Sequence, residues 1–228
     1  MKEHPILFFT PMVLAILEGR KTQTRRVLNP QPYRDVVSIR NDFAPSGVSL
    51  GANYWCSWTE NGDISSHVNF QWKCPYGQVG DRLWVRETFA DGFINGIGST
   101  IIYKADNPDF DKDFLKDGKW KPSIFMTRST SRITLEITDI RVEQLQDISE
   151  EDAIAEGIDS CPSGLNLSSI PASEHFDVYF DYGKTSLPTY HQNPITSFKS
   201  LWDSINAKKH PWANNDWVWV VEFKRIEK

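Results

Sequence analysis

The pattern of apolar and polar positions along the chain predicts strands more often than helices. The clearest strand covers residues 131–142, where Ile133, Leu135 and Ile137 alternate with polar residues. Such alternation is typical of a strand with one buried face. Apolar or alternating segments predict four more strands, at residues 6–9, 82–89, 100–104 and 216–225.

Three short helices are expected between these strands. The first has Thr10 as its cap and ends at Gly19, the second lies between Ser149 and Gly157, and the third opens at Asn193. These helices do not alternate regularly with the strands. We therefore expect an α+β fold in which a mixed or antiparallel sheet closes into a small barrel with short flanking helices.

Two irregular segments interrupt the pattern, at residues 29–79 and 158–193. The first contains several aromatic residues among Pro, Gly, Asn and Ser. Flexible linkers are rich in Gly and Ser and lack such aromatics. We therefore interpret the chain as one domain over residues 1–228 that carries two insertions.

The composition is that of a folded protein, since 39% of the 228 residues are hydrophobic and 13% are aromatic. No apolar run approaches the length of a membrane span, and the first residues do not lead into a signal peptide. The three cysteines are odd in number and widely spaced, which argues against a disulfide framework and against a structural zinc site. These features predict a cytoplasmic protein with neither a membrane nor a disulfide partner.

The net charge is −5, but the charges are unevenly distributed. Residues 1–40 hold seven basic and three acidic side chains, a local balance of +4, whereas residues 147–159 hold six acidic side chains and no basic one. A protein that coats DNA would show a basic excess over its whole domain. The distribution instead favours a bounded anionic ligand.

Four of these seven basic side chains lie directly after the first expected helix, in the segment Gly19-Arg20-Lys21-Thr22-Gln23-Thr24-Arg25-Arg26. Arginine suits phosphate or carboxylate groups, and glutamine can pair with the edge of a base. The surrounding positive charges favour loss of the Lys21 proton, and a neutral lysine can take a proton from a threonine hydroxyl. The pattern leaves open a solvated basic loop without a ligand.

Four blocks of the chain, about half of its length, resemble ASCH-domain proteins of the PUA-like superfamily. The first block is residues 6–9, the helix that follows and a Gly-x-Lys-Thr-x-Thr motif that begins at Gly19. The others are the strand entry at Gly80 and Asp81, the acidic helix at residues 148–157 and the closing strand at residues 217–223. The whole sequence looks most like the larger members of this family that phages and prophages often carry.

The resemblance implies a small β-barrel whose cleft accepts nucleosides or RNA. Some bacterial members are amidohydrolases that remove the acetyl group from N4-acetylcytidine, others are reported as ribonucleases, and many are regarded only as RNA binders. Matching the amidohydrolase motif to this sequence gives Lys21, Thr24 and Glu156 as catalytic residues. Three other acidic residues lie on the same short helix as Glu156, namely Glu150, Glu151 and Asp152.

In the mechanism that we expect, Lys21 deprotonates Thr24, which attacks the acyl carbonyl of a modified nucleoside. Glu156 orients Lys21 or relays a proton, and Arg25 or backbone amides stabilise the oxyanion. This mechanism requires no metal or cofactor. Two alternatives stay open: a noncatalytic RNA-binding module, and a metal-assisted ribonuclease in which Glu156 and its acidic neighbours are the ligands.

The residues expected to bind the substrate are Arg20, Gln23, Arg25, Arg26, Arg86 and Glu87. For the last two, which lie late in the strand at residues 82–89, a surface ion pair is the alternative. Arg128 and Arg132 flank a polar stretch that suits either a phosphate or a solvated strand entry.

The position of Glu156 in its helix leads to a specific prediction. Asp152 and Glu156 share one face of a helix of about two turns. Glu156 lies in the last turn, where the helix dipole disfavours an anion. We therefore expect the Glu156 carboxylate to lie within salt-bridge range of the Lys21 ammonium group.

Overall fold

A computed structural model describes most of the chain, namely residues 1–32, 36–40, 54–59, 72–94, 97–107, 115, 118–161, 178–183 and 189–226. Parts of both expected insertions therefore lie outside the described residues. In the part that is described, no helix is long and apolar enough to cross a membrane.

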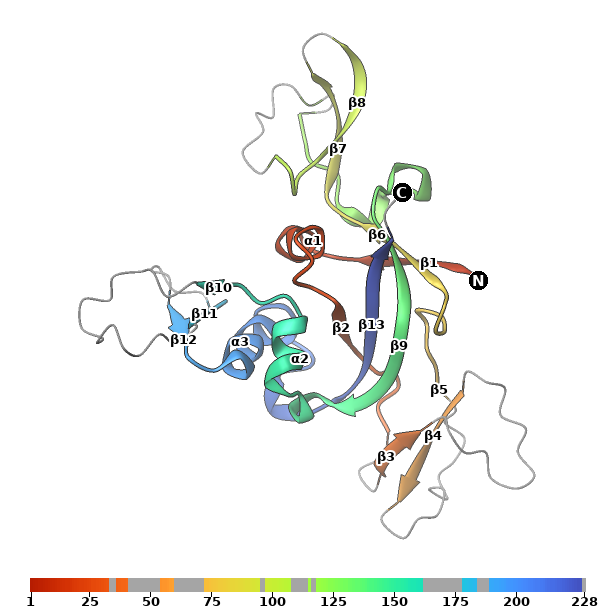
Figure 1. The fold of residues 1–228 in the computed structure, drawn as a ribbon, viewed down its shortest axis with the longest axis vertical. Coiled ribbons are helices and arrows are strands. Elements are labelled where there is room, and N and C mark those ends of the chain that lie inside the picture. Colours follow the sequence, from red (N-terminus) through yellow and green to blue (C-terminus); the bar gives the residue numbers. More distant parts are fainter. Residues whose placement is uncertain are drawn as a thin grey trace. The chain divides into compact units, whose positions relative to one another are not determined.

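A five-stranded mixed sheet is the largest element of the fold. Its strands, in order across the sheet, are β1 (Glu3–Leu7), β6 (Arg82–Arg86), β9 (Thr134–Gln144), β13 (Trp217–Ile226) and β2 (Gln23–Val27) (Figure 1). β1 and β6 are parallel, whereas β6 and β9 are antiparallel. The expected α+β class and mixed sheet are thus confirmed. The expected closure is not found among the described residues, because β1 and β2 form the two ends of the sheet and do not pair with each other.

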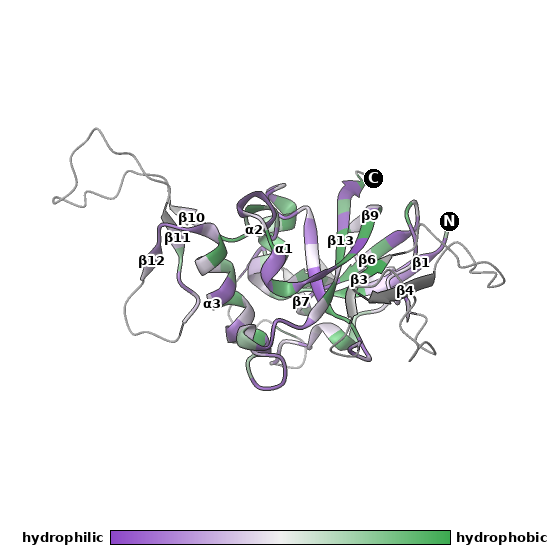
Figure 2. Cartoon of the chain, turned by 90° about the horizontal axis from the view of Figure 1, so that it is seen from below, coloured by the Kyte–Doolittle hydropathy of each residue, from purple (hydrophilic) through white to green (hydrophobic). Residues whose placement is uncertain are grey.

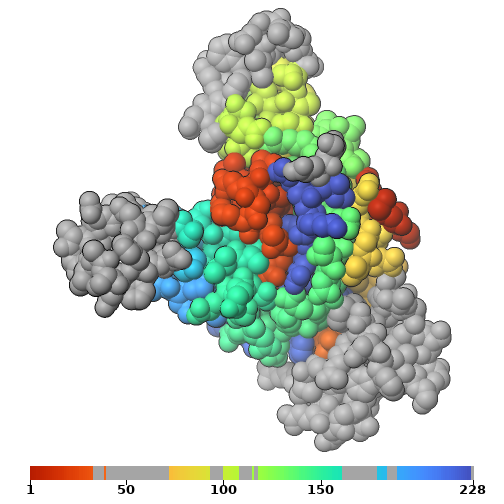
Figure 3. Space-filling model, viewed as in Figure 1, coloured from red at the N-terminus to blue at the C-terminus, as the bar shows by residue number. Residues whose placement is uncertain are grey.

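The chain divides into two compact units, each assembled from separate segments. Unit 1 consists of Met1–Gly19, Pro75–Asp139 and Glu222–Lys228, and unit 2 of Arg20–Cys74 and Ile140–Val221. β9 and β13 lie side by side in the sheet, and each contributes residues to both units (Figures 1 and 3). The expected single domain with two insertions stays a prediction.

In unit 1, the alternation predicted for the strand at residues 82–89 is present in β6. Leu83 and Val85 are buried on one side, whereas Trp84 and Arg86 are only partly buried on the other. The strand ends at Arg86, and a separate hairpin follows, formed by β7 (Phe89–Ile94) and β8 (Ile97–Tyr103).

The first helix, α1 (Thr10–Leu17), also belongs to unit 1. It has Phe9 rather than Thr10 as its N-cap, so the expected cap was wrong by one residue. Pro11 permits this shift, because the backbone N–H that proline lacks would have no partner at either of the first two helical positions. The helix ends as expected at Gly19, whose φ of 77° is favourable for glycine.

The two helices of unit 2 begin at the predicted caps. The Ser149 hydroxyl accepts a hydrogen bond from the Asp152 N–H (3.1 Å) at the start of α2 (Glu150–Ala155). The Asn193 side-chain oxygen accepts hydrogen bonds from the Ile195 and Thr196 N–H groups at the start of α3 (Pro194–Asn206). α3 carries apolar positions among polar ones (Figure 2), and its Phe198 and Trp202 pack into one core with Val218 and Val220 of β13.

Both expected insertions contain short strands, where the sequence pattern indicated irregular structure. β3 (Val36–Arg40), β4 (Tyr54–Thr59) and β5 (Trp72–Lys73) form an antiparallel sheet. β10 (Ser160–Cys161), β11 (Val178–Phe180) and β12 (Tyr190–His191) form another. Strands of two to six residues offer few alternating positions, so the sequence gives little sign of them.

Candidate functional site

The basic segment found in the sequence lies against helix α2 within unit 2. The Thr22 N–H donates to the Ala155 carbonyl (2.9 Å), and the Gln23 side-chain amide donates to the Asp152 carbonyl (2.8 Å). Gln23 is buried, so its amide is engaged with the helix backbone and does not face solvent. These two bonds fix the start of β2 along the helix.

Lys21 makes the contact with Glu156 that the helix geometry predicted. Its Nζ atom donates to the Glu156 carboxylate at Oε2 (2.9 Å) and to the carbonyl oxygen of the same residue (2.7 Å). The Lys21 side chain is fully buried and that of Glu156 is 4% exposed. The predicted ion pair is therefore confirmed, and it lies away from water.

Burial also changes the proton affinity of Lys21. Removal from water disfavours the charged ammonium and lowers the pKa of Lys21 below its ordinary value, while Glu156 opposes this effect. The positive charges of Arg25 and Arg26 lower the pKa further. The sequence had indicated the effect of the neighbouring cations, but the larger cause is burial, which a local charge pattern does not reveal.

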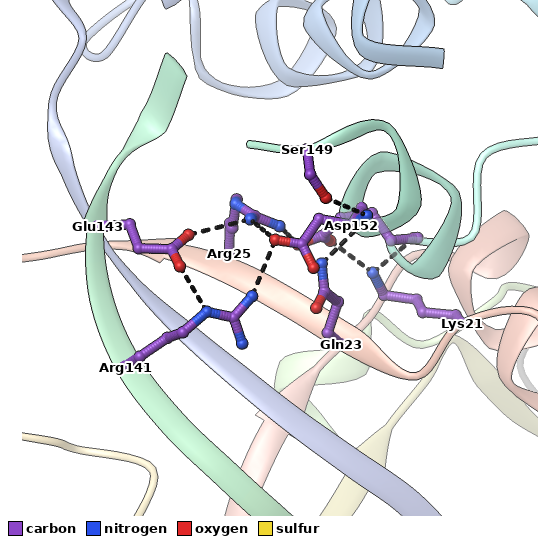
Figure 4. Close-up of polar contacts among 8 residues, drawn as sticks. Lys21, Gln23, Arg25, Arg141, Glu143, Ser149 and Asp152 are labelled. Atoms are coloured by element: carbon purple, nitrogen blue, oxygen red, sulfur yellow. Dashed lines mark hydrogen bonds and ion pairs between the residues drawn. The ribbon is translucent and has the colours of Figure 1, made fainter. Parts of the chain in front are cut away.

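Arg25 connects three carboxylates. Its fully buried guanidinium group donates to Asp152 (2.7 Å), Glu143 (3.2 Å) and Glu156 (3.3 Å). Arg141 reaches two of these carboxylates as well, with Asp152 at 2.8 Å and Glu143 also bound. Figure 4 shows both arginine side chains directed at Glu143 and Asp152.

The arginines decide the charge state of Asp152. Burial by itself would raise the pKa of Asp152, but the hydrogen bonds and positive charges of Arg25 and Arg141 outweigh it and hold the pKa below its ordinary value. Asp152 is therefore an ionised anchor for both guanidinium groups. The face of Arg25 also lies over the Phe198 ring, 6.0 Å from its centroid, which places the charge against the apolar core.

Arg20 and Lys21 together bind the C-terminal end of α2. Arg20 donates to the carbonyls of Gly157 (3.1 Å) and Ile158 (3.4 Å), and its guanidinium group pairs with Asp159 (3.0 Å). α2 has no basic residue of its own in its last turn. The basic segment thus supplies the cations that a helix C-terminus favours.

These contacts change the interpretation of the basic segment as an open cationic site. Arg20, Lys21 and Arg25 are each paired with a carboxylate of the acidic segment at residues 147–159. The two charged segments found in the sequence therefore neutralise each other to a large extent. Binding of substrate by Arg20, Gln23, Arg25 and Arg26 stays a prediction.

Thr24 is buried. It lies between Gln23 and Arg25 in the sequence, but its side chain points to the opposite face of the strand. Because successive side chains of a strand point to opposite faces, Thr24 and Arg26 lie on the side of β2 away from Gln23 and Arg25. In the described part of the chain, no residue forms a hydrogen bond with the Thr24 hydroxyl. The structure thus joins Lys21 and Glu156 directly and leaves the role of Thr24 open to experiment.

The remaining two candidates, Arg86 and Glu87, belong to unit 1 and have partners there. Arg86 donates to the Ile124 carbonyl. Glu87 is buried and accepts two hydrogen bonds from Arg132 (2.9 and 3.0 Å). Burial raises the pKa of Glu87, and Arg132 opposes this rise. Their role in substrate binding stays a prediction.

Sequence reasoning missed Glu143 and Arg141. Both lie at the end of β9, two residues apart and therefore on the same side of the strand. The expected strand ended at Val142, so it included Arg141 but not Glu143. A charged pair at alternate positions beyond an apolar strand was the available signal. Among the described residues, no group of three or more His, Cys, Asp or Glu side chains is arranged to hold a metal ion.

No protein-family model, curated protein or solved structure matches the chain. The resemblance to ASCH-domain proteins therefore stays a prediction.

Proposed function

We propose that this protein hydrolyses an exocyclic N-acyl amide on a base, as in N4-acetylcytidine, and that its sheet is the core of an ASCH-type, PUA-like barrel. Lys21 is the general base, Thr24 the nucleophile and Glu156 the residue that holds Lys21. The observation that carries the proposal is the buried Lys21–Glu156 pair, with 2.9 Å between Nζ and Oε2.

A lysine base must lose its proton near neutral pH, and this requires a pKa well below that of a solvated lysine. Burial lowers the pKa of Lys21, which favours the neutral amine. The two hydrogen bonds to Glu156 fix the position of this amine. Both conditions for a positioned base are thus supported by contacts within unit 2.

The proposed reaction has two steps. The Thr24 hydroxyl proton passes to Lys21 Nζ while Thr24 Oγ1 forms a bond to the acyl carbon. The C–N bond then breaks, and the leaving amine of the base takes the proton from the Lys21 ammonium group. Water hydrolyses the acyl-threonine ester in the second step and releases the acid.

The experiment is a measurement of acetate release from N4-acetylcytidine by the purified protein. Thr24→Val keeps the shape of the side chain without its hydroxyl and is expected to abolish release, whereas Thr24→Ser, the matched control, retains a nucleophile and part of the rate. Thermal unfolding of both variants checks that the fold is intact. Full activity of Thr24→Val would rule out Thr24 as the nucleophile.

Two other results would favour the alternatives. An unmodified protein that releases no acetate but shifts RNA in a gel supports the noncatalytic module. RNA cleavage that depends on a divalent metal ion supports the ribonuclease. The contacts speak for the amidohydrolase over the ribonuclease, because Arg25 already binds the carboxylates of Glu143, Asp152 and Glu156.

A further inference from the structure

Unit 1 carries a mixed aromatic and basic surface on the side of β1 and β6 that faces away from its core. Strand pairing places Glu3 beside Arg82, Pro5 beside Trp84 and Leu7 beside Arg86. Of the intervening residues, Ile6, Leu83 and Val85 are buried, and His4 is partly buried. We call the side with Pro5, Leu7, Trp84 and Arg86 the outer face.

Trp84 is the centre of the outer face. As a strand residue it has Arg82 and Arg86 on the same side, two positions before and after it. The Arg86 guanidinium carbon lies 5.4 Å from the centroid of the Trp84 ring, within range of a cation–π contact. An indole that contacts one guanidinium group, with a second arginine two positions away on the same side of the strand, suits stacking of bases together with binding of phosphates.

The charges of the outer face are positive, although the chain is acidic. Arg82 and Arg86 form an ion pair with no carboxylate among the described residues. Arg128 reaches the same face, where it binds Glu3 with two hydrogen bonds (2.8 and 3.0 Å). Three arginines against one glutamate leave a balance of +2. The next acidic residue, Glu136 of β9, adds no net charge because it pairs with Lys224 (2.9 Å).

Two exposed apolar side chains belong to the short helix that Arg86 contacts. Arg86 donates to the carbonyl of Ile124, which brings the short helix at Ser123–Phe125 to the outer face. Ile124 is 59% exposed and Phe125 is 68% exposed. A solvent-facing phenylalanine in a helix that an arginine of the outer face contacts suits a ligand with flat rings and negative charge.

We propose that the outer face binds single-stranded RNA, with bases stacked on Trp84 and Phe125 and phosphates bound by Arg82, Arg86 and Arg128. The stacking surfaces and the positive balance argue for a single-stranded nucleic acid. The choice of RNA rests on the proposed function, which places a cytidine derivative at the Lys21 site.

The test measures binding of a fluorescently labelled, unmodified 12-nucleotide oligouridine by anisotropy at two salt concentrations. Trp84→Leu and Phe125→Leu keep an apolar side chain without the aromatic ring and should each weaken binding on the order of tenfold. Arg82→Gln should weaken binding and reduce the slope of log affinity against log salt by about 0.7. Lys199→Gln, which removes an exposed cation from α3, is the matched control and should bind like the unmodified protein.

Phe125 is exposed enough for its variant to fold, so the test does not depend on Trp84 alone. Unchanged binding by Phe125→Leu and Arg82→Gln would overturn the proposal, as would binding of the matched DNA at least as tight as that of the RNA. Self-association that Phe125→Leu abolishes, without RNA binding, would assign the face to a second copy instead. Because the oligouridine carries no acyl group, loss of hydrolysis with retained binding contradicts only the proposed function.

Discussion

Lys21 and Arg25 bind opposite oxygens of one carboxylate, that of Glu156. Lys21 Nζ lies 2.9 Å from Oε2, and an Nη atom of Arg25 lies 3.3 Å from Oε1. The carboxylate cannot rotate away from either cation without breaking the contact with the other. Glu156 is therefore held in one orientation before any substrate binds, which is the condition for a positioned catalytic group.

Replacement of Glu156 by glutamine removes the anion that both cations share. We expect Glu156→Gln to lower the free energy of unfolding by about 3 kcal/mol, because a buried ion that loses its partner keeps its desolvation cost. Acetate release should fall as well. Urea unfolding and the hydrolysis assay measure the two effects.

The control is Glu151→Gln, in the exposed first turn of the same helix. It should change stability by less than about 1 kcal/mol and leave the rate nearly unchanged. Equal losses of stability and rate in the two variants would mean that the buried contact of Glu156 contributes no more than an exposed carboxylate.

The lowered pKa of Lys21 predicts how stability depends on pH. Between this pKa and the ordinary value of 10.5, the unfolded chain holds a proton that the folded chain has released. The free energy of unfolding should therefore rise with pH across this window. The contribution is complete above about pH 10.5 and is lost as the pH falls through the folded-state pKa.

This dependence is isolated by comparison with Lys21→Met, which has no titrating group at this position. The stability of the unmodified protein minus that of Lys21→Met should increase from about pH 7 to about pH 10.5. A difference that does not increase over this range would show that the effect of Glu156 dominates and that Lys21 stays charged.

Arg25 cannot be replaced by another cation without loss. Arg25→Lys retains the charge, but a single ammonium group cannot span Glu143, Asp152 and Glu156 in the planar geometry of a guanidinium group. We expect a loss of about 3 kcal/mol in unfolding free energy and faster hydrogen exchange at the Thr22 amide, which binds α2.

Arg20→Lys is the matched control for this substitution. Arg20 is 35% exposed, and its partner Asp159 is 50% exposed, so their ion pair is screened by water. Arg20→Lys should lower the free energy of unfolding by less than about 1 kcal/mol. A loss as large as that of Arg25→Lys would contradict the importance that we assign to burial.

The parts of the fold with strong local signals were predictable from the sequence. Ser149 and Asn193 cap their helices because short polar side chains satisfy free N–H groups at a helix start. The alternation around Leu83 and Leu135 gave the central strands with small errors at their ends. Whether the sheet closes into a barrel could not be predicted, because closure depends on pairing between strands distant in the sequence.

The candidate site was predictable only in part, for a similar reason. The contact between Lys21 and Glu156 followed from a local argument about the helix dipole and the supply of cations. The network of Arg25, Arg141 and Glu143 requires β2, β9 and α2 to meet, and no local pattern contains this information. The mutual neutralisation of the basic and acidic segments also depends on this tertiary contact, so it could not be predicted from either segment alone.

The binding of α2 by Arg20 and Lys21 has a consequence for attempts to transplant this helix. A helix of six residues is too short to persist by itself in water. The two cations that bind its C-terminal end are encoded more than a hundred positions earlier, in a segment that a graft of residues 149–157 would leave behind. Such a graft should be unstructured in a new host until a matching Arg-Lys pair is supplied. The helix and the basic segment therefore depend on each other although they lie far apart in the sequence. A substitution in either one changes which residues the other can accept.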